Sequence, residues 1–383
     1  MKVMVCFREY RDIHENKDPG LIVMGLQELG AEAIMLTTPK HELSDYQAPF
    51  PLVATELSNW VRTIKEIRPD CVIIYHALGR DFTQLLTALH TVGIPVIIKA
   101  DSDGNLSPYP YFKEFTNRYF RQSFTEGMKA VAKIIIPWYA DQWLLANFKK
   151  TRGMIVESPL AKERTLKVLA MKTKANFAAE IYVIPDPVSP LFTQGQIEIQ
   201  RNNQIVSVGR WDDTAPKNPR VLLKAITRAL EVRADYTAIV VGSGESNIRM
   251  WTNLLSQNIK ERIHVVGPLR PDKIKLLLTH SKIFLSSSRW ESFGIAAAEA
   301  LCSGCTLVGP DLPSFRYLMA EGLTGTLGEN STYVALYRAL TREIDLWDQG
   351  ARDPMAVATR WRIALEYRTV AKSIIEKVNI CAL

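Results

Sequence analysis

The sequence predicts a two-domain α/β protein in which each domain is built on a doubly wound parallel sheet. Short apolar runs rich in β-branched residues alternate with helical patterns along the whole chain, as in βαβ units. These runs are almost continuously apolar, which is typical of parallel strands that are buried on both faces. The chain has 383 residues, which is too long for one ordinary core.

The predicted strands start with the first residues of the chain. The N-terminus, MKVMVCFREYRD, carries charge too early for a signal peptide, so we interpret it as a first core strand. The strands expected in the first domain are Val3–Phe7, Ala33–Leu36, Cys71–Tyr75, Pro95–Lys99, Ile134–Pro137 and Ile181–Ile184. Those expected in the second are Gln204–Val208, Thr237–Val241, Ile263–Val266, Lys282–Ser286 and Thr306–Val308. Helical patterns fill the gaps, for example Val221–Val232 and Asn247–Ile259.

The break between the domains is expected at IPDPVSPLFTQGQ, residues 184–196. Three prolines within seven residues are followed there by a polar stretch and then by a new strand. We therefore divide the chain into residues 1–192 and 193–360, followed by a final helical segment, 361–383. Two α/β domains of similar size would leave a cleft between them, which is the usual place for a ligand.

Composition and charge narrow the classes of function. No apolar run reaches the roughly 18 residues of a membrane span. The five cysteines are an odd number and lie mostly beside apolar runs, so we interpret them as reduced thiols in a cytoplasmic protein. Much of the net charge of +7 comes from residues 149–174. This basic region is either a solvated helical face or a surface that attracts anionic lipid headgroups or an anionic substrate. Because it lacks interleaved aromatic residues, we do not expect nucleic acid as a partner.

A candidate phosphate-binding loop opens the second domain, in the stretch IVSVGRWDDTAPKNP. The chain turns at Gly209 after a strand, and Arg210 and Lys217 follow. Ligands of open α/β sheets bind beyond the carboxyl ends of the strands. Two cations at that place can hold a diphosphate, the arginine by a forked contact and the lysine as a point charge. The alternative is a surface turn in which these cations pair with Asp212 and Asp213.

Two further loops that follow strands are candidate ligand contacts. In YTAIVVGSGESN, Gly242 and Gly244 would let the backbone approach a ligand closely. The third glycine and the acidic residue of a dinucleotide fingerprint are missing there. In RIHVVGPL, Gly267 and Pro268 form a turn whose backbone could meet a nucleotide base.

The stretch SSRWESFGIAAAEALCSGC places two glutamates, Glu291 and Glu299, among small apolar residues. We expect Ser292 to cap a helix that starts at about Gly294, so that Glu291 precedes the helix and Glu299 lies inside it. In a largely buried helix of alanines, a glutamate costs several kcal/mol unless it has a partner. The two glutamates therefore need an explanation.

The same stretch would offer anion donors beside hydroxyl acceptors. The backbone N–H groups of Phe293, Gly294 and Ile295 would bind an anion with the help of the helix dipole. The two carboxylates would accept hydrogen bonds from paired hydroxyl groups. This combination suits a nucleoside diphosphate sugar. The alternative is that Glu291 caps the helix and that Glu299 pairs with an arginine.

Together these motifs resemble the retaining glycosyltransferases of family 4, the glycosyl transferases group 1, over about residues 205–328. The resemblance implies the GT-B fold, in which two Rossmann-like domains face a cleft. It also implies that residues 1–192 bind the acceptor and residues 193–360 bind the donor. The helix of residues 361–383 would then cross back to the first domain.

The resemblance further implies a role for each residue of the motifs. Arg210 and Lys217 would bind the donor diphosphate and stabilise the charge that grows on this leaving group. Glu291 would bind hydroxyl groups of the donor sugar, and Glu299 would bind the ribose. KDPGLIVMGLQELG is similar to the glycine loop and first helix of the family, which makes Gly20 a donor-binding candidate.

One position departs from the family. After the strand PVIIKA many members place a histidine in the cleft, and Asp101 takes this position here, so we consider it a candidate catalytic residue. The histidine is not strictly required, because in a same-face attack the leaving phosphate can take the acceptor proton. His76 and Asp103 are candidate acceptor-side residues, although a structural role for His76 is an equal alternative.

Two short motifs raise the question of a metal. Asp101-x-Asp103 also resembles the metal-binding motif of the GT-A fold, in which carboxylates and a diphosphate share a divalent ion. GT-A does not account for a second α/β domain that carries two glutamates, so we expect neither a metal nor another cofactor. Cys302-x-x-Cys305 has the spacing of a redox or zinc motif, but it lies in the predicted helix and the turn after it. We reject a metal site there.

The sequence therefore predicts a retaining glycosyltransferase of the hexosyltransferase type. It would move a sugar from a UDP- or GDP-linked donor to an acceptor hydroxyl in glycan or glycolipid biosynthesis. The acceptor, a glycan, a lipid-linked sugar or a small molecule, stays open. The place of action would be the cytoplasm or, through the basic region, the inner face of the membrane. The alternatives are a nucleotide-sugar epimerase on the same fold and a non-catalytic relative that binds sugar nucleotides.

Overall fold

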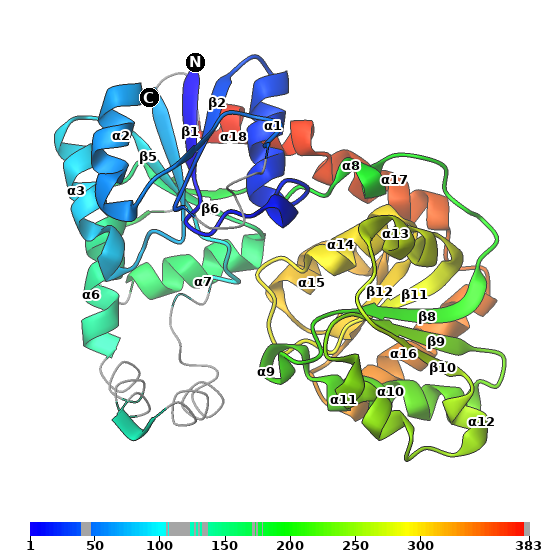
Figure 1. The fold of residues 1–383 in the computed structure, drawn as a ribbon. Coiled ribbons are helices and arrows are strands. Elements are labelled where there is room, and N and C mark those ends of the chain that lie inside the picture. Colours follow the sequence, from blue (N-terminus) through cyan, green and yellow to red (C-terminus); the bar gives the residue numbers. More distant parts are fainter. Residues whose placement is uncertain are drawn as a thin grey trace. The chain divides into compact units, whose positions relative to one another are not determined.

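The structure is a computed structural model of the chain, which divides into two compact units. One unit comprises Met1–Pro187 and Tyr367–Leu383, and the other comprises Val188–Glu366 (Figure 1). The structure describes residues 1–39, 47–104, 106, 123–125, 128, 131, 137–170, 173, 175–177 and 179–378.

The first unit is built on a parallel sheet with the strand order β3-β2-β1-β4-β5-β6-β7. Its described strands are β1 Lys2–Cys6, β2 Glu32–Thr37, β3 Leu52–Ala54, β4 Cys71–Tyr75, β5 Val96–Lys99, β6 Gly153–Val156 and β7 Ile181–Val183. β1 pairs with both β2 and β4, so the order of the strands reverses at this point. Such a reversal opens a crevice at the carboxyl ends of the two strands that flank it.

Helices cover both faces of this first sheet (Figure 1). α1 (Asp18–Glu28) and α18 (Tyr367–Val378) pack on one face. The other face is covered by α2 Trp60–Ile67, α3 Thr83–Thr91, α6 Pro137–Phe148 and α7 Pro159–Ala170. The run CVIIY of β4 is buried throughout because alternate side chains enter the two cores. Three short 3-10 turns complete the described elements of this unit, at Asp12–His14, Leu57–Asn59 and Arg80–Phe82.

The second unit holds a parallel sheet with the strand order β10-β9-β8-β11-β12-β13. Its strands are β8 Asn202–Val208, β9 Thr237–Val241, β10 Ile263–Val266, β11 Ser281–Leu285, β12 Thr306–Pro310 and β13 Gly325–Gly328. One face is covered by α8 Pro190–Thr193, α13 Pro271–His280, α14 Ile295–Cys302, α15 Pro313–Leu318 and α17 Pro354–Leu365. The other is covered by α10 Pro219–Val232, α11 Glu245–Thr252, α12 Gln257–Lys260 and α16 Tyr333–Asp348. Two short pieces, α9 Thr214–Lys217 and a 3-10 turn at Ala320–Gly322, complete it.

The predicted fold class is confirmed, and most predicted strands lie within two residues of the observed ones. The predicted strand Ile134–Pro137 falls almost wholly outside the described residues. Three strands were not predicted, β3, β6 and β13, because each has only three or four residues and two of them begin with glycine. The predicted helix Asn247–Ile259 is wrong. It is two helices, α11 and α12, and Leu254 between them is 82% exposed.

The units divide at Pro187 and Val188, before the expected boundary at residues 192 and 193. The physical reason is that Val188 and Phe192 already pack into the core of the second unit. The final segment expected at 361–383 is also divided, because its first residues belong to α17 of the second unit and α18 belongs to the first. Val188 N donates a hydrogen bond to Leu365 O (2.9 Å), so the two crossing segments are joined within the second unit.

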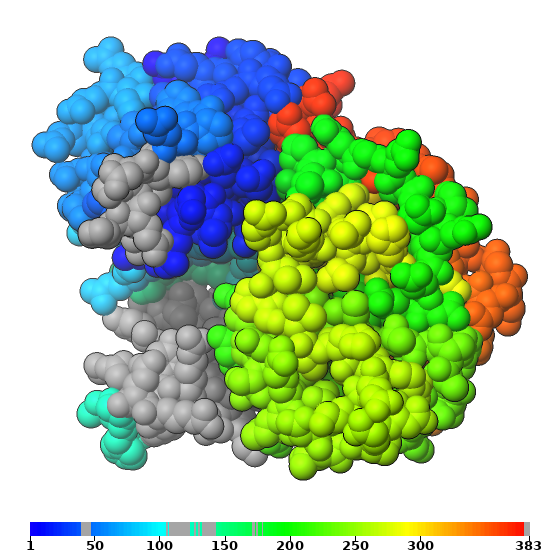
Figure 2. Space-filling view, turned by 45° about the vertical axis from the view of Figure 1, so that its right-hand side comes forward, coloured from blue at the N-terminus to red at the C-terminus, as the bar shows by residue number. Residues whose placement is uncertain are grey.

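α18 lies beside α1, although the two helices come from opposite ends of the chain (Figure 1 and Figure 2). The close approach depends on Gly25, since a Cβ atom there would lie 2.7 Å from Tyr367 O and 2.8 Å from Ala371 Cβ. Tyr367 Oη also donates a hydrogen bond to the Glu28 carboxylate. The C-terminal helix is thus an integral part of the first unit.

We predict that Gly25→Val lowers the free energy of unfolding by about 1 to 3 kcal/mol, because the added methyl groups would force α18 away from α1. Urea unfolding measures this change. Gly79→Val is the matched control, because a Cβ atom at Gly79 meets nothing within 4 Å. Equal stability of the two variants would contradict the packing of α18 on α1.

Candidate functional site

The second unit brings two of the predicted site residues together where its strand order reverses. β8 pairs with β9 on one side and with β11 on the other. Lys217 ends α9, which follows β8, and Glu291 lies between β11 and α14. Because all strands of this sheet are parallel, both residues lie at the carboxyl edge, where ligands of open α/β sheets bind.

Lys217 and Glu291 form a short ion pair. Lys217 Nζ lies 2.5 Å from Glu291 Oε1, and the two side chains are 20% and 16% exposed. Ser288 Oγ donates to the same carboxylate oxygen (2.6 Å), and Ser287 Oγ donates to Lys217 O (2.6 Å). These two serines were not predicted as site residues. The signal that could have found them is the run SSS after an apolar strand.

Arg210 lies in a more open position than Lys217. Its side chain is 74% exposed, and its guanidinium lies 3.6 Å from the carboxylate of Asp213. The next residue, Trp211, is buried and donates from Nε1 to Val241 O (3.0 Å). The Arg210–Asp213 contact is the pairing that the sequence left open as an alternative. A pair this exposed is weak and can be exchanged for a ligand at little cost.

The candidate glycines after β8 and β9 let two loops pack against each other. Gly242 has a φ of 134°, and a Cβ atom there would lie 1.7 Å from Gly209 O. Gly244 has a φ of 76°, and its Cβ would lie 2.3 Å from Asp212 N. Ser243 joins the same contact, since its O accepts from Trp211 N (2.7 Å). Packing between the loops is therefore sufficient to account for both glycines.

Gly267 and Pro268 follow β10 at the same edge. Gly242 N donates to Gly267 O (3.3 Å), so the loops after β9 and β10 are joined through their backbones. A Cβ atom at Gly267 would lie 3.2 Å from Glu245 Oε1, at the start of α11. Pro268 is exposed.

The start of α14 differs from the prediction. The residue that caps the helix is Gly294, with a φ of 89°, and not Ser292. The left-handed conformation and the ring of Phe315, 2.9 Å from a Cβ built at Gly294, both require glycine. Ala297 N and Ala298 N donate to Gly294 O. The N–H groups of Gly294 and Ile295 thus precede the first intrahelical bonds, as an anion site needs.

The side chains around the start of α14 have different surroundings. Phe293 is fully buried in the core, so that only its backbone could contact a ligand, whereas Ile295 is partly exposed. Glu299 is also partly exposed, which corrects the expectation that it is buried among alanines. Glu299 follows Ile295 by four residues and so lies on the same helix face. Access to solvent on this face lowers the cost of the charge of Glu299.

In the first unit, the structure brings Asp101 and His76 together. His76 follows β4 directly and Asp101 follows β5 after one residue, and both have a positive φ, 55° and 43°. His76 Nε2 lies 3.5 Å from Asp101 Oδ2, and both side chains reach solvent. Asp103 is held separately, because Arg164 donates to its Oδ2 (3.1 Å). The two aspartates of the Asp-x-Asp motif therefore have different partners.

Gly20 lies inside the first turn of α1. A Cβ atom there would lie 2.4 Å from His14 O and 2.6 Å from Glu15 O. The space beside Gly20 is thus filled by the turn that precedes α1. Packing of that turn accounts for the glycine without a ligand.

The main feature that sequence reasoning missed is a buried charge cluster around Lys99. Lys99 is fully buried, and its Nζ lies 2.7 Å from Glu157 Oε1, 2.5 Å from Asp186 Oδ1 and 3.8 Å from Asp18 Oδ2. Ser102 N donates to the other oxygen of Glu157 (3.1 Å). The signal in the sequence is a charged residue at or just after the end of several apolar strands, as in VIIK, MIVE and YVIPD.

One ammonium group cannot neutralise three carboxylates, and the titration of the cluster reflects this. Burial raises the pKa of Glu157 to about 7 and raises the pKa of Asp18 and of Asp186 above their ordinary values. Burial also opposes the charged form of Lys99, but the carboxylates outweigh it and hold its pKa well above the usual range. The lysine therefore stays charged, and Glu157 keeps its proton on part of the molecules at pH 7.

The cysteines of the C-x-x-C motif are packed in the core of the second unit. Burial raises the pKa of Cys302 to about 12 and that of Cys305 to about 11. Cys305 Sγ donates to Leu278 O (2.9 Å) and to Ser281 O (3.2 Å). Neither thiol has thiolate character at neutral pH, which metal binding and redox exchange require. Within the described ranges, no group of three or more His, Cys, Asp or Glu could hold a metal ion.

Comparison with known proteins identifies the second unit. Residues 192–352 match the family described as Glycosyl transferases group 1. This match covers most of the second unit and leaves the first unit outside it. A stretch of 139 residues, 36% of the chain, is 28% identical to the phosphatidyl-myo-inositol mannosyltransferase of Mycobacterium leprae (strain TN) and covers 36% of it. The chain thus matches only about a third of that relative's length.

Solved structures match this chain over its whole length. HepE of Anabaena, solved with UDP, has a TM-score of 0.71 at 14% identity, with 100% of both chains covered. The lipopolysaccharide outer core galactosyltransferase WaaB has a TM-score of 0.69 at 13% identity, again with 100% of both chains covered. At this identity the likeness shows the fold, and the expected GT-B fold is confirmed.

The basic region, residues 149–174, is described only in part. Lys149, Arg152 and Lys167 are exposed, and Arg164 pairs with Asp103. Lys172, Lys174 and most of the aromatic segment 104–124 lie outside the described residues. None of the helices in the described part of the chain has the length and apolar character that crossing a membrane requires.

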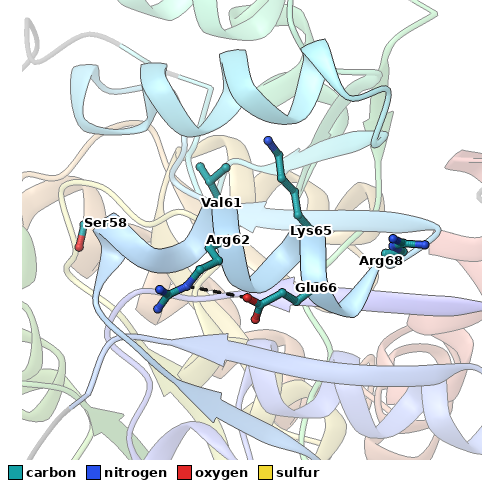
Figure 3. Close-up of a pocket in the computed structure, with 6 residues that line it drawn as sticks. All are labelled: Ser58, Val61, Arg62, Lys65, Glu66 and Arg68. Atoms are coloured by element: carbon teal, nitrogen blue, oxygen red, sulfur yellow. Dashed lines mark ion pairs between the residues drawn. The ribbon is translucent and has the colours of Figure 1, made fainter.

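An open hollow in the first unit lies along α2, away from the predicted residues (Figure 3). It measures about 570 Å³ and is lined by Ser58, Val61, Arg62, Lys65, Glu66 and Arg68. Arg62 and Glu66 form an exposed ion pair at 3.9 Å along the helix. None of the predicted site residues contributes to this hollow.

We predict that the Lys99 cluster makes the protein less stable as the pH rises through 7. The pKa of Glu157, about 7, is raised above its value in the unfolded chain, so folding favours the protonated form. The stability that this preference contributes is fully present below the unfolded pKa and is lost as the pH passes the folded one. Between about pH 6.5 and pH 8 we expect urea unfolding to show a loss of about 1 kcal/mol.

The variant Glu157→Gln should lose most of this pH dependence. Glu163→Gln is the matched control, since Glu163 is an exposed glutamate on the neighbouring helix α7. If the free energy of unfolding of Glu157→Gln depended on pH as steeply as that of the wild type, a group other than Glu157 would hold the proton.

Proposed function

We propose that the chain is a retaining glycosyltransferase that moves a sugar from a UDP- or GDP-linked donor to an acceptor hydroxyl. The observation that carries the proposal is the Lys217–Glu291 pair at the strand reversal of the second sheet. It places a cation for a diphosphate directly beside a carboxylate that can accept hydroxyl hydrogen bonds. A site for only a phosphate or only a sugar would not need both groups in one place.

The relatives support this class of reaction. The Mycobacterium leprae protein is named as a mannosyltransferase for phosphatidyl-myo-inositol, and HepE was solved with UDP. WaaB is named as a galactosyltransferase of the lipopolysaccharide outer core. We therefore propose a hexosyl donor and an acceptor from glycan or glycolipid biosynthesis.

Donor binding would exchange one ionic contact for another. The diphosphate would take the place of Glu291 at Lys217 Nζ, and the forked guanidinium of Arg210 would bind it from the exposed side. Glu291, released from the lysine, would accept hydrogen bonds from the donor sugar. Both cations would then stabilise the charge that grows on the departing diphosphate.

The remaining donor contacts would come from backbone groups and from α14. The N–H groups of Phe293, Gly294 and Ile295 would face the phosphates, and Glu299 would bind the ribose. The joined loops at Gly209, Gly242, Gly244, Gly267 and Pro268 would border the nucleotide. Because such contacts read shape rather than side-chain identity, the base stays open between uracil and guanine.

On the acceptor side, we propose that Asp101 and His76 face the acceptor hydroxyl, with Asp103 holding the loop to α7. The exposed cations of the basic region would attract an anionic acceptor or an anionic membrane surface. Action at the inner face of the membrane follows from this attraction as a proposal. The leaving phosphate would take the acceptor proton, so that no metal or cofactor is needed.

We predict opposite effects of Lys217→Met and Glu291→Gln on the binding of a free nucleoside diphosphate. Lys217→Met should weaken it by about 10- to 100-fold, because a charge-assisted contact is lost and Glu291 then repels the phosphates. Glu291→Gln should leave it unchanged or tighter, yet weaken the binding of the intact sugar nucleotide relative to the free diphosphate. Isothermal titration calorimetry with UDP, GDP and their sugars measures both effects.

Lys260→Met and Glu261→Gln are the matched controls, since Lys260 ends α12, Glu261 follows it, and both residues are exposed. Equal weakening of the free diphosphate by Lys217→Met and Glu291→Gln would contradict the division of roles between phosphate and sugar.

We also predict that one nucleotide class raises the melting temperature of the wild-type protein, because bound ligand stabilises the folded state by mass action. The shift should be insensitive to EDTA and should shrink in Arg210→Ala but not in Arg228→Ala, an exposed arginine on α10. A shift that requires a divalent ion would contradict the metal-free mechanism. Conversion of the donor sugar without an acceptor would instead identify an epimerase, and the absence of any shift would contradict the enzyme.

A further inference from the structure

The segment Asp101–Gly104, which follows β5 after Ala100, is held at each of its four residues. Asp101 contacts His76, and Ser102 N donates to Glu157. Asp103 accepts from Arg164, and Gly104 packs so closely on Ala161 that a Cβ atom would lie 2.2 Å from Ala161 O. A loop with this many independent contacts has one conformation rather than many.

This conformation is costly for Asp101. Its φ of 43° is in the left-handed region, which residues other than glycine rarely adopt. Such a residue persists only where its surroundings over-determine it, and such residues gather at functional sites. The residue after Asp101 is held by a hydrogen bond, which Ser102 N donates to Glu157 Oε2 at 3.1 Å.

Lys99 connects to both members of the Asp101–His76 pair. Through its side chain it holds Glu157 Oε1 at 2.7 Å, and Glu157 in turn holds Ser102. Through its backbone it fixes the other member, because His76 N donates to Lys99 O (3.0 Å). Lys99 has no exposed surface, so it cannot meet a substrate itself.

We propose that Lys99 and Glu157 form a positioning relay that fixes Asp101 against His76 for the acceptor. Neither residue touches the acceptor, so they are positioning residues and not catalytic ones. The kinetic part of this proposal rests on the proposed transfer reaction. The structural part, the order of the loop, does not.

The relay works best when Glu157 is ionised, because a carboxylate can accept from Lys99 and Ser102 at the same time. The pKa of Glu157, about 7, means that this condition changes near neutral pH. The titratable groups that interact with the relay from the elements packed around it are Asp18 of α1, Tyr75 of β4, His76, Asp101 and Asp186. The segment Asp101–Gly104 should therefore become more ordered as the pH rises through 7.

The first test is the exchange rate of the Ser102 amide hydrogen in Glu157→Gln, followed by NMR. A glutamine keeps the size of the side chain and one oxygen acceptor, which Lys99 would retain. We expect Ser102 to exchange at least about tenfold faster than in wild type, because the loss of its acceptor opens the loop. In Glu163→Gln the rate should not change. Equal rates in Glu157→Gln and Glu163→Gln would overturn the proposal.

The second test is kinetic and uses the full-length protein with a competent acceptor. Glu157→Gln should lower kcat by about 10- to 100-fold through misplacement of Asp101. The affinity for the free nucleoside diphosphate, a property of the second unit, should stay at the wild-type value. A normal kcat with fast Ser102 exchange would show that the loop moves without consequence and would refute the relay's role.

The two tests separate failure of this inference from failure of the proposed function. If no acceptor supports transfer, the proposed function fails, and the exchange rate of Ser102 still decides whether the relay orders the loop. If Glu157→Gln does not fold, a pH titration of the wild-type protein replaces the comparison of variants. Its Ser102 amide resonance must then shift with a midpoint near pH 7, the pKa of Glu157, and a resonance that does not move would overturn the relay.

Discussion

Parallel pairing of the strands is the constraint on which both units depend. It places the carboxyl ends of all strands in a sheet at the same edge. The loops that follow neighbouring strands therefore lie side by side there. In the second unit the strand order reverses between β9-β8 and β11, and Lys217 and Glu291, 74 residues apart, meet at this reversal. Their contact is a consequence of topology, and no local pattern in the sequence could encode it.

The two units use ion pairs in opposite ways. The Lys217–Glu291 pair keeps access to solvent, so its net strength is modest, and under the proposed function the donor diphosphate would replace the carboxylate. Lys99 and its carboxylates are buried, where the loss of one partner leaves an uncompensated charge at high cost. An exchangeable pair suits a binding site, whereas a buried cluster suits a part that must not move. Their difference in burial thus suits Lys217 and Glu291 to contact a ligand and suits the Lys99 cluster to hold other residues in place.

The sequence was sufficient for those features that depend on neighbours along the chain. Runs such as CVIIY located the buried strands, whereas GTLG and LVA were too short and too poor in β-branched residues to be found. The Lys99 cluster was missed because its members come from separate elements. Glu299 was misjudged because alanines on both sides suggested burial, although the helix face decides exposure. The roles given to Arg210, Lys217 and Glu291 stay predictions, since geometry alone does not name a ligand.

The departure at Asp101 is better understood from the sheet than from the alignment of motifs. β4 and β5 are neighbours in register, with Tyr75 opposite Lys99, so the residues that follow them lie side by side. In the glycosyltransferase family that the motifs resemble, a histidine often follows the strand that we align with β5. This chain has Asp101 there, and His76 lies beside it at the end of the adjacent strand. If the edge requires an imidazole, a histidine after either of these two strands supplies it. The position of the imidazole then depends on the two neighbouring strand ends together. Under the proposed function, an aspartate in place of the histidine after β5 would therefore not by itself abolish glycosyl transfer.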